Sequence, residues 1–85
     1  MLLSQLPNGA NAVVQRVVPA HAEVGEATLR RLGELGFIAG EPVQVLRRGP
    51  GGREPLAVQV GETLFALRLL EAQCIEVQAQ GAGII

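Results

Sequence analysis

The hydrophobic and polar positions along the chain fall into short blocks with the period and composition of β-strands. Residues 12–18 (AVVQRVV) are rich in β-branched side chains and lie between a Pro-Asn-Gly turn and Pro19. Turn residues of this kind typically bound a strand. Four later blocks alternate apolar and polar positions in the same way. We therefore expect five strands, at residues 12–18, 43–48, 56–60, 63–68 and 74–79.

Between residues 23 and 35 the period changes to that of an amphipathic helix. Apolar side chains recur at helical spacing on one face, while Glu and Arg side chains group on the other. Gly36 ends the pattern and predicts a left-handed C-cap, with Phe37 folding back onto the helix. Arg31 falls on the apolar side, so its stem should cover core surface while its guanidinium seeks a carboxylate or a carbonyl. The apolar face is formed by Val24, Thr28, Leu32 and Leu35.

The connections between these blocks carry turn residues. Residues 49–55 are the richest in Gly and Pro, and Gly61-Glu62 fits a two-residue hairpin loop with Gly first. Residues 69–73 are too short for a helix of their own and predict one tight turn. Residues 80–85 have no pattern, and we expect a frayed tail there.

Five short strands with one early helix predict a mainly β fold. We expect a small, strongly bent antiparallel barrel, with the short α-helix inserted after the first strand. The 85 residues leave room for a single domain, residues 1–85, with a core from about residue 2 to residue 79.

Composition narrows the classes of function. Seven Arg and eight Glu give a net charge of −1, Lys and Asp are absent, and the two Phe are the only aromatic residues. Nucleic acid is therefore not an expected partner, since phosphate neutralisation needs a basic surface and base stacking needs aromatic rings. Without Lys the chain also lacks the phosphate-binding loop of nucleotide hydrolases.

The cysteine count and the N-terminus bear on location. Cys74 is the only cysteine, so an internal disulfide is excluded, and residues 1–9 contain no basic residue and only a short apolar run. This is not the pattern of a signal peptide, and no apolar run approaches the ~18 residues of a membrane-spanning helix. We expect a cytoplasmic protein with no direct membrane insertion.

The residues that could carry chemistry are few. Ser4 is the only serine, His21 the only histidine, and no Asp could orient them, so a nucleophile triad is not predicted. An enzyme is therefore not expected. His21, Glu23 and Glu26 lie within six residues at the entry to the helix, and one imidazole with two carboxylates suits Fe(II) or Zn(II). This shell is incomplete, so we expect either an exposed histidine near carboxylates, with no cofactor required, or a metal shared with a neighbouring molecule.

A series of blocks resembles the FeoA family of ferrous iron transport accessory proteins. The blocks appear in order and at the family's intervals, and the similarity runs from about residue 2 to residue 77. The opening residues 3–9 (LSQLPNG) are also similar to the start of that family. The blocks are residues 31–40 (RLGELGFIAG), 43–45 (VQV), 55–58 (PLAV), 65–68 (FALR) and 75–77 (IEV).

The resemblance implies an SH3-like barrel with a helix after its first strand, in agreement with the fold predicted from the pattern. It also implies a non-catalytic, cytoplasmic accessory of the membrane iron permease FeoB, peripherally associated with the inner face of the membrane through that partner. The exposed helix face and the hairpin edges are the expected contact surface. The same domain type resembles the C-terminal module of diphtheria-toxin-repressor-type regulators, which leaves a metal-sensing role as the alternative. The oligomeric state stays open, a weak homo-oligomer included.

Overall fold

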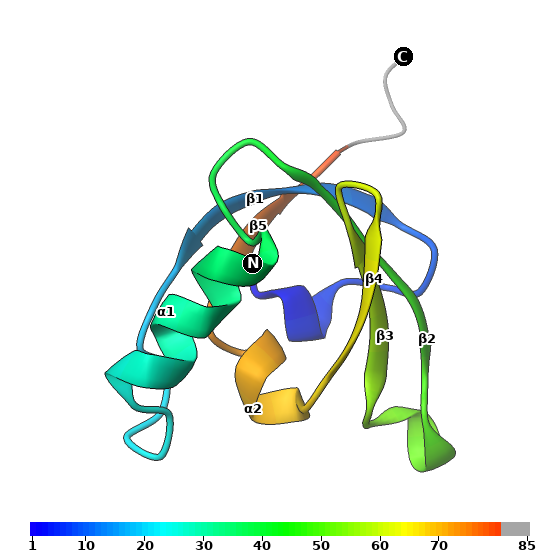
Figure 1. Cartoon of the computed structure of the whole chain (residues 1–85). Coiled ribbons are helices and arrows are strands. Elements are labelled where there is room, and N and C mark those ends of the chain that lie inside the picture. Colours follow the sequence, from blue (N-terminus) through cyan, green and yellow to red (C-terminus); the bar gives the residue numbers. More distant parts are fainter. Residues whose placement is uncertain (81–85) are drawn as a thin grey trace.

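The chain folds around one antiparallel sheet, with a helix between its first two strands (Figure 1). This computed structural model describes residues 1–80. The five predicted strands and the helix after the first of them are confirmed. The strands are β1 (Asn11–Val17), β2 (Pro42–Arg48), β3 (Leu56–Val60), β4 (Thr63–Leu67) and β5 (Ile75–Ala79), and the helices are α1 (Glu26–Leu35) and α2 (Leu69–Ala72), with 3₁₀ turns η1 (Leu3–Gln5) and η2 (Pro50–Gly52).

The strands follow the order β4-β3-β2-β1-β5, and every neighbouring pair is antiparallel. The register shifts between Val14 and Arg16 in β1 and between Val45 and Arg47 in β2. Such bulges bend and twist a strand. The sheet is consequently strongly bent and curves around the interior of the domain (Figure 1). Its two end strands are β4 and β5.

The core lies inside the bend and is almost wholly aliphatic. Inward positions alternate along each strand; in β3, for example, Leu56, Val58 and Val60 are buried while the residues between them are partly exposed. Phe37 is the one fully buried aromatic side chain. No charged or polar residue is buried within residues 1–80. The sheet is therefore held by apolar packing on one face, as the strand pattern predicts.

Helix α1 begins later than the helical pattern predicts. It starts at Glu26 and not at residue 23, because Gly25 has extended backbone angles and takes the N-cap position. Its end is as predicted: Gly36 is left-handed with φ 119°, and the Phe37 amide donates to the Leu32 carbonyl at 3.1 Å. This is the Schellman pattern that turns the chain back onto the helix.

Two other segments differ from expectation or lie outside the structure. Leu69–Ala72 forms a one-turn α-helix, whereas the sequence predicted a turn too short to be helical. Beyond Gln80, the predicted frayed tail falls outside the described residues. Within residues 1–80, no helix combines the length and the apolar character needed to cross a membrane.

The N-terminal segment closes one side of the bend. Leu3 and Leu6 are completely buried. Leu2 forms an isolated antiparallel β-bridge with Glu76, and the Val77 amide donates to the Met1 carbonyl at 2.8 Å. The outer edge of β5 is thus covered by the chain's own N-terminus.

Candidate protein-interaction surface

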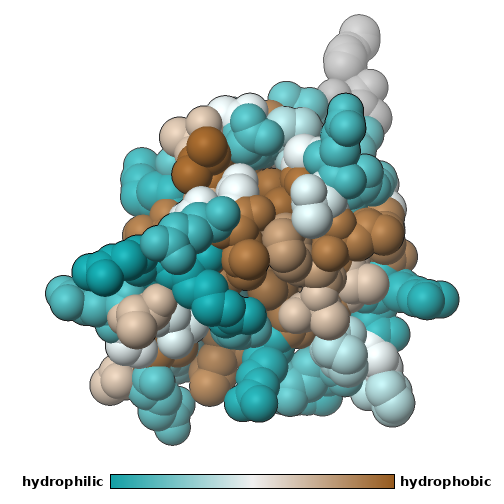
Figure 2. Space-filling view, in the orientation of Figure 1, coloured by the Kyte–Doolittle hydropathy of each residue, from teal (hydrophilic) through white to brown (hydrophobic). Residues whose placement is uncertain are grey.

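One face of the molecule carries an apolar area between α1 and β4, above α2 (Figure 2). These three elements carry apolar side chains that pack on the core yet remain partly exposed. A contiguous apolar patch on a small domain marks a site for another macromolecule more often than a solvated surface. We call this area the apolar face and define it by Leu35 of α1, Phe65 of β4, and Leu69 and Leu70 of α2.

Polar contacts at its border fix the elements that form the apolar face. Arg31 of α1 pairs with Glu71 of α2, with 3.2 Å between Nη1 and Oε2. This confirms the expectation that the Arg31 guanidinium finds a carboxylate. The Leu69 amide, at the start of α2, donates to Glu54 Oε1 at 2.7 Å. The two helices of the apolar face are therefore joined to each other, and α2 is also joined to the loop before β3.

An aromatic contact supports the sheet side of the apolar face. The rings of Phe37 and Phe65 lie 6.0 Å apart between centroids at an interplanar angle of 46°, within the range of favourable aromatic pairs. Because Phe37 is fully buried and Phe65 only partly, Phe65 connects the exposed apolar face to the centre of the core.

The three predicted metal-ligating residues do not converge into one shell. Glu23 and Glu26 are exposed, Glu23 in the turn before α1 and Glu26 in its first turn. His21 instead contacts Gln73, at the end of α2, through its Nε2 and the Oε1 of Gln73. Among residues 1–80, no three His, Cys, Asp or Glu side chains lie close enough to hold a metal. A shell built from one molecule is therefore not formed by the described residues.

The contact with Gln73 nevertheless leaves His21 suited to be a metal ligand. A carboxamide oxygen can only accept a hydrogen bond, so in the neutral tautomer that donates from Nε2 to Gln73 the Nδ1 atom keeps its lone pair. Metal-bound histidines usually donate the second ring N–H to a carbonyl or carboxylate in this way. His21 thus offers one oriented nitrogen, to which ligands from elsewhere would have to be added.

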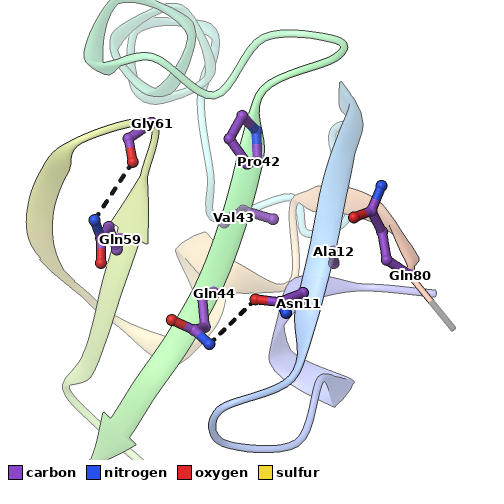
Figure 3. Close-up of a pocket in the computed structure, with 8 residues that line it drawn as sticks. All are labelled: Asn11, Ala12, Pro42, Val43, Gln44, Gln59, Gly61 and Gln80. Atoms are coloured by element: carbon purple, nitrogen blue, oxygen red, sulfur yellow. Dashed lines mark hydrogen bonds between the residues drawn. The ribbon is translucent and has the colours of Figure 1, made fainter. Parts of the chain in front are cut away.

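The outer face of the sheet carries a polar hollow of about 230 Å³ (Figure 3). Its polar side chains are all carboxamides. Gln44 Nε2 donates to Asn11 Oδ1 at 3.2 Å and to the Gly9 carbonyl at 2.7 Å. No charged side chain lines the hollow, so it lacks a general acid or base and the ligands that divalent transition metals prefer. It is lined by Asn11, Ala12, Pro42, Val43, Gln44, Gln59, Gly61 and Gln80.

Sequence reasoning missed this hollow and the apolar face for one reason. Both are assembled from segments far apart in the chain. Asn11 faces Gln44, and Gln44 faces Gln59, only because the strand register places them opposite one another. The available signal was the recurrence of carboxamides at outward strand positions. This signal predicts that the outer face of the sheet carries carboxamides, but it does not predict which of them lie opposite one another.

A bent antiparallel sheet with a helix after its first strand is the arrangement of an SH3-like domain. A family model described as the FeoA domain matches residues 1–79. The chain therefore belongs to the FeoA family, whose members are ferrous iron transport accessory proteins.

Solved structures agree with this assignment. The FeoA of Stenotrophomonas maltophilia, whose crystal structure was determined in complex with zinc, is 51% identical, with a TM-score of 0.80, over 92% of this chain and 89% of that chain. That protein is described as a prokaryotic SH3 domain protein, for which a role as a bacterial ferrous iron transport activating factor was suggested. The FeoA protein of Chlorobium tepidum, solved by NMR, is 34% identical with a TM-score of 0.81, over 99% of this chain and 74% of that chain.

The fold extends to a regulator. A manganese-dependent transcriptional repressor is 21% identical with a TM-score of 0.74, and the match covers 94% of this chain and 41% of the repressor. At that identity only the fold is shared. None of the curated proteins matches the chain.

Proposed function

We propose that this chain is a non-catalytic interaction module that docks through its apolar face on the cytoplasmic side of the permease FeoB. There it modulates Fe(II) transport or the GTPase cycle. The observation that carries the proposal is the apolar face itself. Its side chains lie on β4 and on two helices joined by the Arg31–Glu71 ion pair, and all of them are partly exposed. Such a surface binds a partner by excluding water from both sides.

Family membership supports the transport process, and the chemistry of the chain supports the mode of action. The described residues offer hydrogen bonds at the carboxamide hollow and apolar contact at the apolar face. Neither surface supplies a nucleophile or an acid–base pair. A module of this kind acts by favouring one conformation of its partner, to which it must bind more tightly than to the other.

The test is binding of the purified chain to the cytosolic GTPase portion of FeoB and to the full-length permease in detergent. Each is measured with and without a GTP analogue and Fe(II). Isotope-labelled chain allows the contact surface to be mapped by NMR, and we expect the amide signals of Leu35, Phe65, Leu69 and Leu70 to shift or broaden. A nucleotide or metal dependence would identify the state that is recognised.

Two matched variants locate the contact. Leu70→Gln replaces an apolar side chain on the apolar face, whereas Leu46→Gln replaces a 40% exposed leucine of β2. We expect Leu70→Gln to weaken binding about tenfold or more, with Leu46→Gln unchanged, since truncation of a central apolar contact costs ~1–2 kcal/mol or more. Thermal melting of both variants checks that they fold. Absence of binding to either form of the permease would count against the proposal.

A second candidate function is binding of a divalent transition metal at His21, with Glu23 or Glu26 and ligands from a neighbouring molecule. The contact of His21 with Gln73 favours it, because the tautomer that donates from Nε2 to Gln73 Oε1 leaves Nδ1 to coordinate. The zinc in the related crystal structure supports the same chemistry. In this role the chain would carry or sense the metal, and its oligomeric state would depend on the metal.

Calorimetry with Fe(II), Mn(II) and Zn(II) tests the metal proposal. We expect the wild-type chain to bind metal and to dimerise more tightly when metal is added, and His21→Ala to lose the metal binding and this metal-dependent gain. Glu34→Ala, which removes an exposed glutamate at the other end of α1, serves as the control. Equal binding by wild type and His21→Ala would place the metal elsewhere and refute this site.

A further inference from the structure

The end strand β4 is an open, uncharged sheet edge. Its five residues, Thr63–Leu67, contain no charged side chain and no proline, which are the residues that natural proteins place on edge strands to prevent further pairing. Leu64 is 62% exposed. The other end strand is different, since the N-terminal segment covers the outer edge of β5.

The hairpin fixes which backbone groups of β4 point away from the sheet. The loop Gly61-Glu62 joins β3 and β4, so Val60 and Thr63 form the first hydrogen-bonded pair and the pattern then alternates. Leu64 and Ala66 therefore direct their N–H and C=O groups outward. Within residues 1–80, neither residue has a backbone hydrogen bond to any other segment.

We propose that two copies of this chain pair through their β4 strands, antiparallel and centred on Phe65, to form one continuous sheet across a two-fold axis. In this register Leu64 of one copy lies opposite Ala66 of the other. Opposed residues of a hydrogen-bonded pair exchange both of their N–H···O bonds. Every outward backbone group of Leu64 and Ala66 is then satisfied.

The side chains also match in this register. On the outer face, the large, exposed Leu64 comes to lie against the small Ala66 of the second copy, so apolar surface is removed from water without a clash. At the ends of the pairing, Glu62 lies opposite Arg68 of the second copy. Both residues are exposed, and neither belongs to an ion pair among the described residues.

This charge arrangement is the reason for choosing a second copy over an unrelated strand. A neutral strand with a Glu before it and an Arg after it is complementary to itself only when antiparallel. The flanking charges then attract at both ends, while a parallel copy would place like charges together. Because this pairing is short, it buries less surface area than a standard interface. We therefore expect a dissociation constant in the micromolar to millimolar range.

The register is tested by cross-linking. In a mixture of Leu64→Cys and Ala66→Cys chains, the two introduced cysteines face each other, with Cα atoms about 5.5 Å apart, within the range of a disulfide. We expect covalent heterodimers on mild oxidation of the mixture, and little or none when either variant is oxidised alone. Cys74, the native cysteine, is buried. Equal cross-linking in all three samples would refute the register.

The affinity is tested by sedimentation of the purified chain over a concentration series. Arg68→Glu should raise the dissociation constant about tenfold by placing like charges opposite each other, and adding Glu62→Arg should restore it. Ala66→Pro removes an outward N–H and leaves the β3 ladder intact; it should abolish dimerisation. Arg47→Glu is the matched control, on an exposed arginine away from β4.

Failure of this proposal is distinct from failure of the docking proposal, because no permease is present. A chain that stays monomeric at millimolar concentration would overturn the dimer whether or not it binds FeoB. A dimer that Ala66→Pro and Arg68→Glu leave intact would show pairing through another surface and would overturn it as well.

Discussion

Arg31 of α1 and Glu71 of α2 form an ion pair in which Nη1 lies 3.2 Å from Oε2, and this pair joins the two helices beside the apolar face. The Glu71 side chain is only 15% exposed, whereas that of Arg31 is 56% exposed. The other carboxylate oxygen of Glu71, Oε1, accepts the backbone N–H of Arg68 at 2.8 Å. One carboxylate thus caps α2 and holds it against α1.

This double role predicts unequal effects of removing the two partners. Arg31→Gln loses only a partly exposed ion pair and should reduce the free energy of unfolding by less than about 1 kcal/mol. Glu71→Ala loses the pair and the cap, and should cost about 1 to 2 kcal/mol. Urea denaturation measures both. Equal losses would contradict the capping role of Glu71.

A second prediction concerns two leucines of α1. The helical pattern places Leu32 and Leu35 on the same face, but Leu32 is fully buried and Leu35 belongs to the partly exposed apolar face. Leu32→Ala should therefore destabilise the chain by about 3 to 4 kcal/mol through a cavity, and Leu35→Ala by about 1 to 2 kcal/mol. Comparable losses in the two melting curves would mean that Leu35 is as deeply packed as Leu32.

The strands were predictable from the sequence because each is short and carries alternating apolar positions, and because the first four follow a turn that contains Gly or Pro. Residues 56–60 match β3 at both ends, and the hairpin at Gly61-Glu62 separates it cleanly from β4. What the pattern could not supply is the order of the strands. That β4 lies at an open edge, while β5 is covered by the N-terminus, depends on pairings between distant segments.

The helices show where local rules give way to tertiary contacts. Val24 continues the helical spacing and is buried, yet it precedes α1, because the chain turns at Gly25. Helix α2 is too short to be stable alone. It forms because Ala72 is buried in the core and because Glu54 and Glu71 accept the free N–H groups at its start.

A third prediction concerns Arg48, which fastens the N-terminal segment to β2. Its Nη2 donates to the carbonyls of Ser4 and Leu6, each at 3.0 Å, and its Nη1 donates to Asn8 Oδ1. Loss of these charge-assisted bonds in Arg48→Met should cost about 2 to 3 kcal/mol. The side chain of the neighbouring Arg47 is exposed and, unlike that of Arg48, makes no contact to the N-terminal segment within residues 1–80, so Arg47→Met should change stability by less than about 0.5 kcal/mol.

Hydrogen exchange locates the effect of Arg48→Met. If Arg48 acts on the N-terminal segment, the amides of Leu6 and Val77, which depend on η1 and on the cover over β5, should lose protection before those of β3. Uniform loss across the sheet would instead indicate a global effect of Arg48 on the core.

The candidate metal ligands show why closeness in sequence did not become closeness in space. His21, Glu23 and Glu26 lie in a turn and the first residues of a helix, where successive side chains point in different directions. His21 therefore contacts Gln73, which is 52 residues away in sequence. It does not form a metal-holding group with Glu23 and Glu26. The sequence predicted His21 as a candidate metal ligand but did not predict its contact with Gln73.

The last prediction follows from that contact. If Gln73 Oε1 holds the hydrogen on Nε2 and so directs Nδ1 towards a metal, Gln73→Ala should weaken Zn(II) binding about 10- to 100-fold, the usual effect of removing such a partner. Gln73→Glu should keep or strengthen binding, because a carboxylate accepts the same hydrogen bond and is the common partner of metal-bound histidine. Gln78→Ala, on an exposed glutamine of β5, should have no effect. Calorimetry at one fixed pH compares the three. If Gln73→Ala binds Zn(II) as tightly as the wild-type chain, the metal does not depend on an oriented His21, and the imidazole serves only to connect the loop before α1 to the end of α2.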